Sequence, residues 1–257
     1  MAQQPFTRCR DYPARPQQVY LMGTCLVDSF DPQAGMDAIQ FLQHHGVEVL
    51  FPQQQSCCGQ PAFNSGFDDE ARQVARQQLK AFAADIPVVV MMGSCAAMLH
   101  CDYARLFEGQ PEEAQAKALA ARTFEFTEFV DRVLCLPPLP ASGERVVLHT
   151  SCSARRSMGV AECHQRVLQN SGVEVVEPNR VTECCGFGGT FALKQGDISA
   201  AMACDKAEAV AACGVDTLVS ADCGCLMNIG GTLAKQGRPI KTRHIASLLR
   251  QRQEESL

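Results

Sequence analysis

Residues 19–25 read Val-Tyr-Leu-Met-Gly-Thr-Cys, and residues 146–152 read Val-Val-Leu-His-Thr-Ser-Cys, an offset of 127 positions. The triplet Cys57-Cys58-Gly59 returns at the same offset as Cys184-Cys185-Gly186. Matches in the same order and at a constant spacing indicate an internal repeat rather than coincidence. The chain is therefore expected to be a tandem duplication.

A third pair of similar segments, 88–95 and 217–225, extends the repeat with a slip of three residues. Between the two copies lies Leu136-Pro-Pro-Leu-Pro-Ala-Ser-Gly143, a proline-rich stretch typical of a semi-rigid spacer. We therefore expect a first repeat over residues 19–135 and a second repeat over residues 144–250. Residues 1–18 are polar and proline-containing, which predicts a flexible tail.

Each half alternates short apolar runs with longer helical patterns. The expected strands are 19–22, 47–51, 88–92, 146–149, 173–176 and 217–220. The expected helices are 36–45, 68–84, 112–133, 160–170, 197–213 and 244–253. Strands separated by helices predict parallel βαβ units. The fold class is therefore α/β, with two tandem, structurally similar small parallel-sheet halves related by a pseudo-twofold axis.

Composition excludes several classes of protein. The net charge of −5 provides no basic surface for nucleic acid. The polar N-terminus does not read as a signal peptide, and the longest apolar run, residues 86–99, is too short and too interrupted to span a bilayer. We therefore expect a cytoplasmic protein without a transmembrane segment. Fifteen cysteines in a reducing compartment indicate metal or redox chemistry rather than a disulfide framework.

The repeat places cysteines just after its expected strands. The carboxyl ends of parallel strands meet at one edge of a sheet, where such folds bind ligands. Four thiols that are distant in sequence should therefore converge in each half. The candidate ligands of the first half are Cys25, Cys57, Cys58 and Cys95, and those of the second half are Cys152, Cys184, Cys185 and Cys225.

Four thiolates suit either an iron–sulfur cluster or a structural zinc ion. Zinc sites usually take their cysteines from Cys-x-x-Cys turns, whereas two of the cysteines here are adjacent. Both can reach one cofactor only if the chain turns sharply, and Gly59 and Gly186 provide the backbone freedom for that turn. A cluster with several irons accommodates neighbouring thiolates better than one tetrahedral ion does. A zinc scaffold and a thiol–disulfide enzyme remain as alternatives at this point.

The double order of Cys, then Cys-Cys-Gly, then Cys resembles the cysteine-rich CCG domain family. Further likeness lies in Gln55-Ser-Cys-Cys-Gly-Gln-Pro-Ala62, Cys184-Cys-Gly-Phe-Gly-Gly-Thr-Phe191 and Lys241-Thr-Arg-His-Ile-Ala246. That family includes the catalytic subunit of heterodisulfide reductase, the iron–sulfur subunit of glycolate oxidase, and the lactate-utilisation A proteins. The chain is most similar to the last group, because it consists of two such repeats and nothing else.

The resemblance implies an iron–sulfur electron-transfer subunit of a bacterial complex that oxidises L-lactate, a small 2-hydroxy acid, to pyruvate. It implies one or two [4Fe–4S] clusters, with zinc as the alternative occupant of one site. It also implies two partner subunits and a cytoplasmic location, with any contact to the inner membrane made through those partners. An iron–sulfur subunit of a glycolate-type oxidase is the near alternative. Whether the dehydrogenation itself takes place on this chain is left open.

Some residues depart from the family pattern or stay ambiguous. Met98 and Asn228 stand where a closing Cys-x-x-Cys is common, so each site has four thiolates at most, which suits a cubane cluster rather than a five-cysteine non-cubane one. Cys225 is favoured over Cys223 as the last ligand. His149 is either a neighbour of the second site or a core histidine. Cys163, Cys204 and Cys213 are expected to be core fillers and Cys9 a free thiol. No function is assigned to Cys101 or Cys135.

Overall fold

The computed structural model describes residues 10–256 and forms two parallel α/β halves. The sheet of the first half has the order β2-β1-β3-β4 and that of the second has the order β6-β5-β7-β8, with every pairing parallel. The strands are β1 (Gln18–Met22), β2 (Glu48–Leu50), β3 (Val88–Val90), β4 (Thr123–Glu125), β5 (Arg145–Leu148), β6 (Glu174–Val176), β7 (Thr217–Ser220) and β8 (Lys241–His244). The predicted fold class is confirmed.

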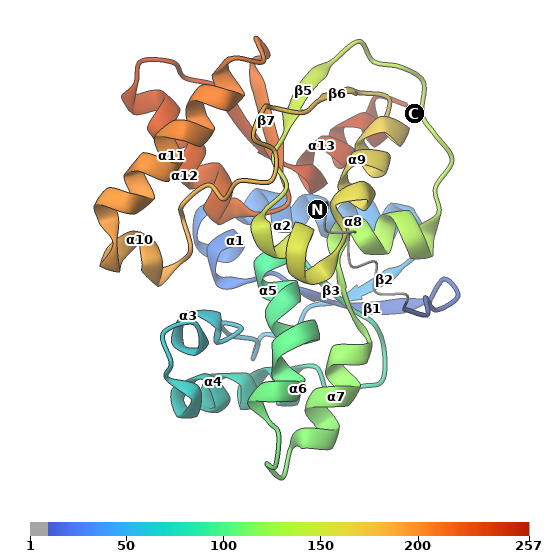
Figure 1. Cartoon of the computed structure of the whole chain (residues 1–257). Coiled ribbons are helices and arrows are strands. Elements are labelled where there is room, and N and C mark those ends of the chain that lie inside the picture. Colours follow the sequence, from blue (N-terminus) through green and yellow to red (C-terminus); the bar gives the residue numbers. More distant parts are fainter. Residues whose placement is uncertain (1–9, 257) are drawn as a thin grey trace, which may run out of the picture.

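The helices of the first half connect and cover its sheet. They are α1 (Cys25–Phe30), α2 (Pro32–His44), α3 (Gln60–Phe63), α4 (Asp68–Ala81), α5 (Gly93–Ala97), α6 (Tyr103–Leu106), α7 (Glu113–Ala121) and α8 (Phe126–Phe129), with the π-helical turns η1 (Met98–Asp102) and η2 (Val130–Leu134). Those of the second half are η3 (Ser153–Met158), α9 (Ala161–Asn170), α10 (Thr190–Lys194), α11 (Gly196–Ala211), α12 (Cys223–Lys235) and α13 (Ile245–Glu254). Figure 1 shows the second half, yellow-green to red, largely above the blue and green first half.

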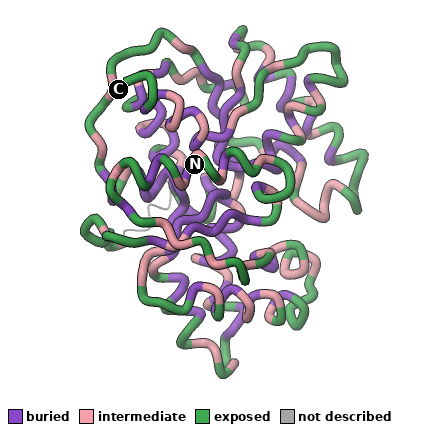
Figure 2. Tube along the Cα trace, turned by 180° about the vertical axis from the view of Figure 1, so that it is seen from behind, coloured by how far each residue is buried: buried purple, intermediate pink, exposed green. Residues whose placement is uncertain are grey.

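The strands form the centre of each half. All three residues of β3 are fully buried, as expected for a central strand of a parallel sheet with both faces covered. Figure 2 shows the buried trace concentrated in the strands and where the halves meet, with the exposed trace in outer loops and helices. The strands therefore form the buried core of each half, and this core holds the side chains at the strand ends rigidly.

Two short strands were not predicted, and each adds a fourth member to its sheet. The helix expected over residues 112–133 is wrong: it is interrupted by β4, and Glu125 then begins α8 with a capping box that it shares with Glu128. In the second half, β8 ends at His244, whose Nδ1 accepts the backbone N–H of Ala246 and begins α13. Both helix starts are therefore fixed by side-chain caps.

The contacts between the two halves come in equivalent pairs: where an element of the first half contacts one of the second, their counterparts also contact each other. A pseudo-twofold relation requires this pattern. Helix α5 packs on η3, and its counterpart α12 packs on α1. Likewise α2 packs on α13, and its counterpart α9 packs on α8. At the first of these contacts a Cβ on Gly93 would lie 2.7 Å from the Cβ of Ala154, so only glycine permits the observed approach. The ends of the strands that carry the cysteines are thereby held face to face.

Part of the segment expected to be a flexible tail contacts the first half. The guanidinium of Arg10 donates to the carboxylate of Glu128 at 3.2 Å and to the carbonyl of Thr123 at 2.7 Å, and Tyr12 also donates to Glu128. Arg10 and Tyr12, within the segment expected to be a flexible tail, therefore contact the first half, whereas Cys9 lies outside the described residues. Among the helices of residues 10–256, none is long and apolar enough to cross a membrane.

Candidate metal centres

The four predicted thiols of the first half come together just beyond the ends of β1, β2 and β3. Cys25 opens α1, Cys57 and Cys58 lie in the loop after β2, and Cys95 lies in α5. The sulfur of Cys58 is 3.4 Å from that of Cys95. Cys57 accepts hydrogen bonds from the thiols of Cys25 and Cys58. A single contiguous group of four sulfurs results.

The second half repeats this arrangement. The sulfur of Cys185 lies 3.2 Å from that of Cys225, and the sulfur of Cys184 lies 3.9 Å from that of Cys152. These four residues occupy the corresponding positions after β5, β6 and β7. Cys225 faces the group, whereas Cys223 is buried and does not line the cavity that the group lines. The geometry therefore agrees with the choice of Cys225 as the candidate ligand.

A left-handed glycine makes each adjacent pair turn toward one point. Gly59 has φ of +87° and Gly186 has φ of +85°, values that residues with a side chain rarely adopt. Each glycine also donates its N–H toward the first sulfur of the pair, Gly59 to Cys57 at 3.5 Å and Gly186 to Cys184 at 3.4 Å. The turn thus brings both thiols to one side and directs a backbone amide at the group.

One thiol in each group is strongly acidic. Hydrogen bonds from Cys25, then from Cys58, lower the pKa of Cys57 to about 2. The corresponding bonds from Cys152 and Cys185 lower the pKa of Cys184 to about 2. The donors respond in the opposite direction, since the shared proton, followed by burial, raises the pKa of Cys25 and of Cys152. Metal ligands must be deprotonated, so a bound cation would replace these shared protons.

Both groups line one cavity of about 240 Å³ between the halves. Within residues 10–256, the cysteines that line it are Cys25, Cys57, Cys58, Cys95, Cys152, Cys184, Cys185 and Cys225. Asp222 also lines the cavity, and its carboxylate accepts the backbone N–H of Ser94 from the other half at 3.1 Å. Burial raises the pKa of this carboxyl group. The two sites therefore share one cavity, and the hydrogen bond between Ser94 and Asp222 joins the two halves there.

His149 is a buried neighbour of the second site. One ligand atom each from His149, Cys185 and Cys225 lies within 4.8 Å of the others, and all three residues are buried. Its Nε2 has no hydrogen-bond partner. Burial, followed by the charge of Lys206, lowers the pKa of His149 to about 3, so the ring is neutral. An unsatisfied buried nitrogen on a ring that lies beside two sulfurs favours a role at the site over a role in the core.

The donor sets fit a thiolate-bound metal group. Each site offers four cysteines in a cavity lined by both halves, with sulfur pairs 3.2–3.9 Å apart, and the pKa of one thiol in each site is lowered by its neighbours. Clustered cysteines of this kind bind iron–sulfur clusters or zinc. The eight cysteines that line the cavity are not joined by disulfides. The arrangement can therefore hold a soft metal or cluster at each site.

Two side chains that fix the loops were not singled out from the sequence. The hydroxyl of Tyr103 donates to the carbonyl of Cys58 at 2.9 Å, and the amide of Asn228 donates to the carbonyl of Cys185 at 2.8 Å. Both lie on elements that follow the third strand of their half. The sequence marked Asn228 only as a departure from a closing Cys-x-x-Cys, and it gave no signal for Tyr103.

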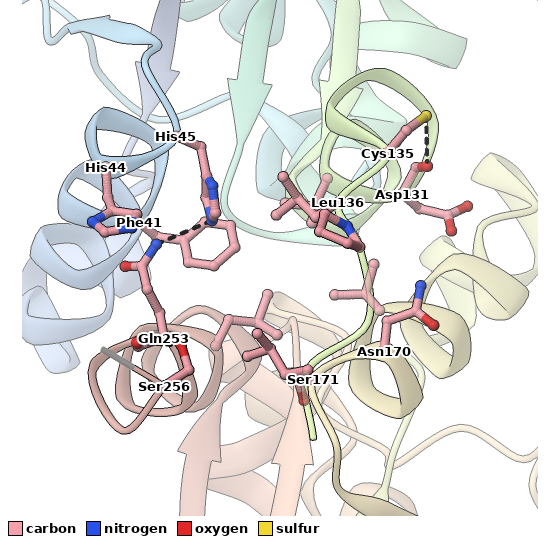
Figure 3. Close-up of a pocket in the computed structure, with 15 residues that line it drawn as sticks. Phe41, His44, His45, Asp131, Cys135, Leu136, Asn170, Ser171, Gln253 and Ser256 are labelled. Carbon is pink, nitrogen blue, oxygen red and sulfur yellow. Dashed lines mark hydrogen bonds between the residues drawn. The ribbon is translucent and has the colours of Figure 1, made fainter. Parts of the chain in front are cut away.

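The remaining cysteines lie away from the shared cavity. Cys163 is buried in α9, as expected for a core residue, and Cys204 and Cys213 are partly buried in and just after α11. Cys135 lines a separate cavity of about 230 Å³ between α2, η2 and α13 (Figure 3). There its thiol donates to the carbonyl of Asp131, and it is the single cysteine among the described residues that line this cavity. That second cavity therefore offers no cluster of thiols.

His45 lines this second cavity, and its contacts are not those of a charged partner for the dipole of α2. Its Nε2 is 3.0 Å from the side-chain amide of Gln253 in α13. Burial, followed by the charge of His44, lowers the pKa of His45 to about 4. The ring is therefore neutral where it lines the cavity.

Comparisons with known proteins agree with the duplicated cysteine pattern. The model of the CCG cysteine-rich domain matches residues 19–100 and again residues 146–230. Lactate utilization protein A of Geobacillus sp. (strain WCH70) is 44% identical over 238 residues, which is 91% of this chain and 100% of that protein. Lactate utilization protein A 1 of Bacillus anthracis (strain CDC 684 / NRRL 3495) is 40% identical over 235 residues, 90% of this chain and 97% of that protein.

A solved structure is similar in fold alone. The crystal structure of a hypothetical protein from Helicobacter pylori superposes with a TM-score of 0.61 at 11% identity, covering 96% of this chain and 51% of that one. The duplicated domain match and the extended identity to the lactate utilization proteins carry the assignment. The chain belongs to the CCG cysteine-rich domain family, with two copies of the domain, and within it to the group formed by the lactate utilization A proteins.

Proposed function

We propose that this protein is the iron–sulfur electron-transfer subunit of a bacterial complex that oxidises L-lactate to pyruvate. The observation that carries the proposal is the convergence of four thiols in each half on one shared cavity. The substrate comes from the printed name of relatives that are 40–44% identical over the length of the chain. Two partner subunits and a cytoplasmic location complete the proposal.

The proposed ligands are the eight cysteines of the shared cavity. A bound [4Fe–4S] cluster supplies one-electron transfer. The protein holds the four sulfurs of each site together, excludes bulk water by burying Cys58, Cys95, Cys185 and Cys225, and directs the N–H of Gly59 and of Gly186 at the ligands. Backbone amides near thiolates stabilise negative charge and thereby tune a cluster. The proposed ligand set contains no fifth cysteine at either site, which favours a cubane cluster.

A zinc ion is the second candidate for one site, and a specific observation favours it. The grouping of His149, Cys185 and Cys225 within 4.8 Å resembles the mixed nitrogen and sulfur ligands of a tetrahedral zinc site. In that case the second half would act as a scaffold for partner subunits, and redox chemistry would rest on the first site or on the partners. The two candidates differ in metal content and in colour.

The test is metal analysis of protein purified without oxygen, with its visible spectrum before and after reduction by dithionite. We expect iron and acid-labile sulfide in equal amounts and a broad absorbance that bleaches on reduction. Cys58→Ser and Cys185→Ser should each remove the iron of one site and reduce lactate-dependent electron flow in the assembled complex. Cys204→Ser, outside the cavity, is the matched control and should change neither.

Two results would contradict the proposal. Zinc without iron, in a colourless sample that dithionite does not change, would favour the scaffold. Unchanged iron content in both Cys58→Ser and Cys185→Ser would show that the cavity is not the metal site.

A further inference from the structure

The two sites present the same thiols but differ at the positions immediately around them. The offset of 127 residues that pairs Cys25 with Cys152 also pairs Met22 with His149. Met22 is fully buried and apolar, whereas His149 is buried with a polar nitrogen that lacks a partner. The second site therefore has a polar ring nitrogen where the first site has a thioether.

The same offset pairs Asp28 of α1 with Arg155 of η3. Asp28 lines a hollow together with Cys25 and Cys57 and places a carboxylate beside the first site. Arg155 acts electrostatically on His149, and its Nε is buried without a hydrogen-bond partner. The charge at this position thus changes from negative in α1, which begins with Cys25, to positive in η3, which directly follows Cys152.

A third difference follows from the helices that pack on the two glycine turns. A Cβ on Gly59 would approach the carbonyl of Ala71, and one on Gly186 would approach the carbonyl of Ser199, so these two helix positions correspond. Seven residues further along lie Gln78 in α4 and Lys206 in α11.

Gln78 and Lys206 make the same kind of hydrogen bond to the chain but differ in charge. Each is buried and donates to a carbonyl of the loop that leads into its cysteine pair: Gln78 to Ser56 and Cys57, and Lys206 to Arg180. Burial lowers the pKa of Lys206, and the charges of Glu183 and Cys185 oppose that shift. A neutral amide therefore supports the first site and an amine supports the second.

Two acidic residues near the second site do not reverse this pattern. Glu183 forms an ion pair with Arg180 at 2.9 Å, so its charge is balanced locally. Asp222 lines the shared cavity and acts on Cys152 and Cys225, so it opposes the pattern, but its carboxylate is partly balanced by the backbone N–H of Ser94, which it accepts at 3.1 Å. The other differences add positive charge or a polar nitrogen to the second site.

We propose that the two sites are electronically inequivalent and that the cluster of the second half has the higher reduction potential, because His149, Arg155 and Lys206 stabilise its reduced form. Reduction adds negative charge to a cluster, and nearby cations and hydrogen bonds to its sulfurs favour that state. Met22, Asp28 and Gln78 give the first site no such stabilisation. This inference rests on the proposed function, since it requires bound clusters. It makes the second site the electron-accepting one of the pair.

The experiment is a potentiometric titration of the full-length protein, reconstituted without oxygen with ferrous iron and sulfide and followed by electron paramagnetic resonance. Cys58→Ser and Cys185→Ser assign each signal to a site. His149→Met and Lys206→Gln then place the residue of the first site at the second. Lys235→Gln removes the same charge as Lys206→Gln from an exposed position on α12 and is the matched control.

We expect the higher potential to belong to the centre that survives in Cys58→Ser. His149→Met and Lys206→Gln should each shift that potential downward, toward the value of the first site, while Lys235→Gln leaves it unchanged. Methionine fills a volume close to that of histidine, so His149→Met decides the question if Lys206→Gln does not fold. If iron loads the second site alone, the downward shift in these two variants is still expected.

Several results would overturn the inference. These are equal potentials, a higher potential at the first site, iron at the first site alone, or an unshifted second centre in iron-loaded His149→Met and Lys206→Gln. A protein that binds no iron at all contradicts the proposed function itself and the inference with it. Metal content therefore separates the two failures, because an iron-loaded protein with unshifted potentials refutes the inference alone.

Discussion

Replacing Gly186 by alanine tests whether the glycine turn is what brings the second cysteine pair into place. The residue has φ of +85°, and a Cβ there would lie 2.6 Å from the carbonyl oxygen of Ser199 and 2.9 Å from the Cβ of Met202. The carbonyl belongs to the backbone of α11, so it cannot move without displacing the helix. The substitution is therefore both conformationally strained and overpacked.

The magnitude follows from these two contributions. A residue with a Cβ in the left-handed region costs about 1–2 kcal/mol, and overpacking against a rigid neighbour costs about 1–3 kcal/mol more. Gly186→Ala should thus lower the free energy of unfolding by about 2–5 kcal/mol. Gly46→Ala isolates the first contribution, because Gly46 has φ of +76° and a Cβ added there would meet no atom within 4 Å.

Urea unfolding of the metal-free protein, followed by circular dichroism, measures both variants against the unchanged chain. Metal content of each variant then reports on the sites: Gly186→Ala should lose metal at the second site and keep it at the first. If Gly186→Ala costs no more than Gly46→Ala and retains its metal, the turn does not determine the position of Cys184 and Cys185.

Two further predictions concern Asn228, which donates to the loop of the second cysteine pair, and Glu125, which caps α8. Asn228→Ala should lower the free energy of unfolding by about 1–3 kcal/mol, because the buried carbonyl of Cys185 loses its donor; urea unfolding measures it against Gln236→Ala on the exposed end of α12, and equal costs would refute it. Glu125 is fully buried and burial raises its pKa, but the charge and hydrogen bonds of His164, Thr127 and Glu128 outweigh burial, so the pKa is lowered below 4.5. Its contribution to stability is therefore present above pH 4.5 and is lost as the pH falls through the lower folded pKa. In Glu125→Gln the free energy of unfolding should fall less steeply as the pH is lowered below 4.5. An unchanged slope in that pH range would contradict this.

The cysteine positions were predictable because they depend on a rule of sheets rather than on detailed packing. Thiols that follow successive parallel strands must meet at one edge, and the duplication shows the same order twice. The short strands β4 and β8 were not predictable in this way. Thr123-Phe-Glu125 is three residues long and sits inside a helical pattern, so the alternation that identifies a strand has no room to appear.

The helices that carry the cysteines were also missed, for a different reason. Helix α5 is Gly-Ser-Cys-Ala-Ala, a run of small residues whose periodicity is too weak to predict a helix. It forms because its small side chains let it pack against η3 of the other half, a contact that only the folded chain supplies. Tertiary packing, rather than local preference, determines such segments.

The surroundings of the two sites were readable from the sequence only in part. Aligning the halves pairs Met22 with His149 and Asp28 with Arg155, so these differences were present in the repeat itself. The pairing of Gln78 with Lys206 needs the structure, because the helices that carry them are registered by contacts with Gly59 and Gly186 and not by the offset of the cysteines. The order of the ligands is thus visible in the sequence, whereas the charges that surround a ligand group are identified fully only in the structure.

The two halves carry the same set of thiols but differ in the residues around them, and this difference has a physical basis. The cysteines of each group lie against one another's thiols, so replacing one of them removes a sulfur–sulfur contact within its group. A side chain one layer away, such as Met22 or Gln78, can change its polarity while keeping its volume and its packing. Because both groups line one cavity, such changes make two sites of equal construction differ in electrostatics. A gradient between two sites of this kind favours transfer of electrons in one direction, which is the property that distinguishes a relay from a duplicated scaffold.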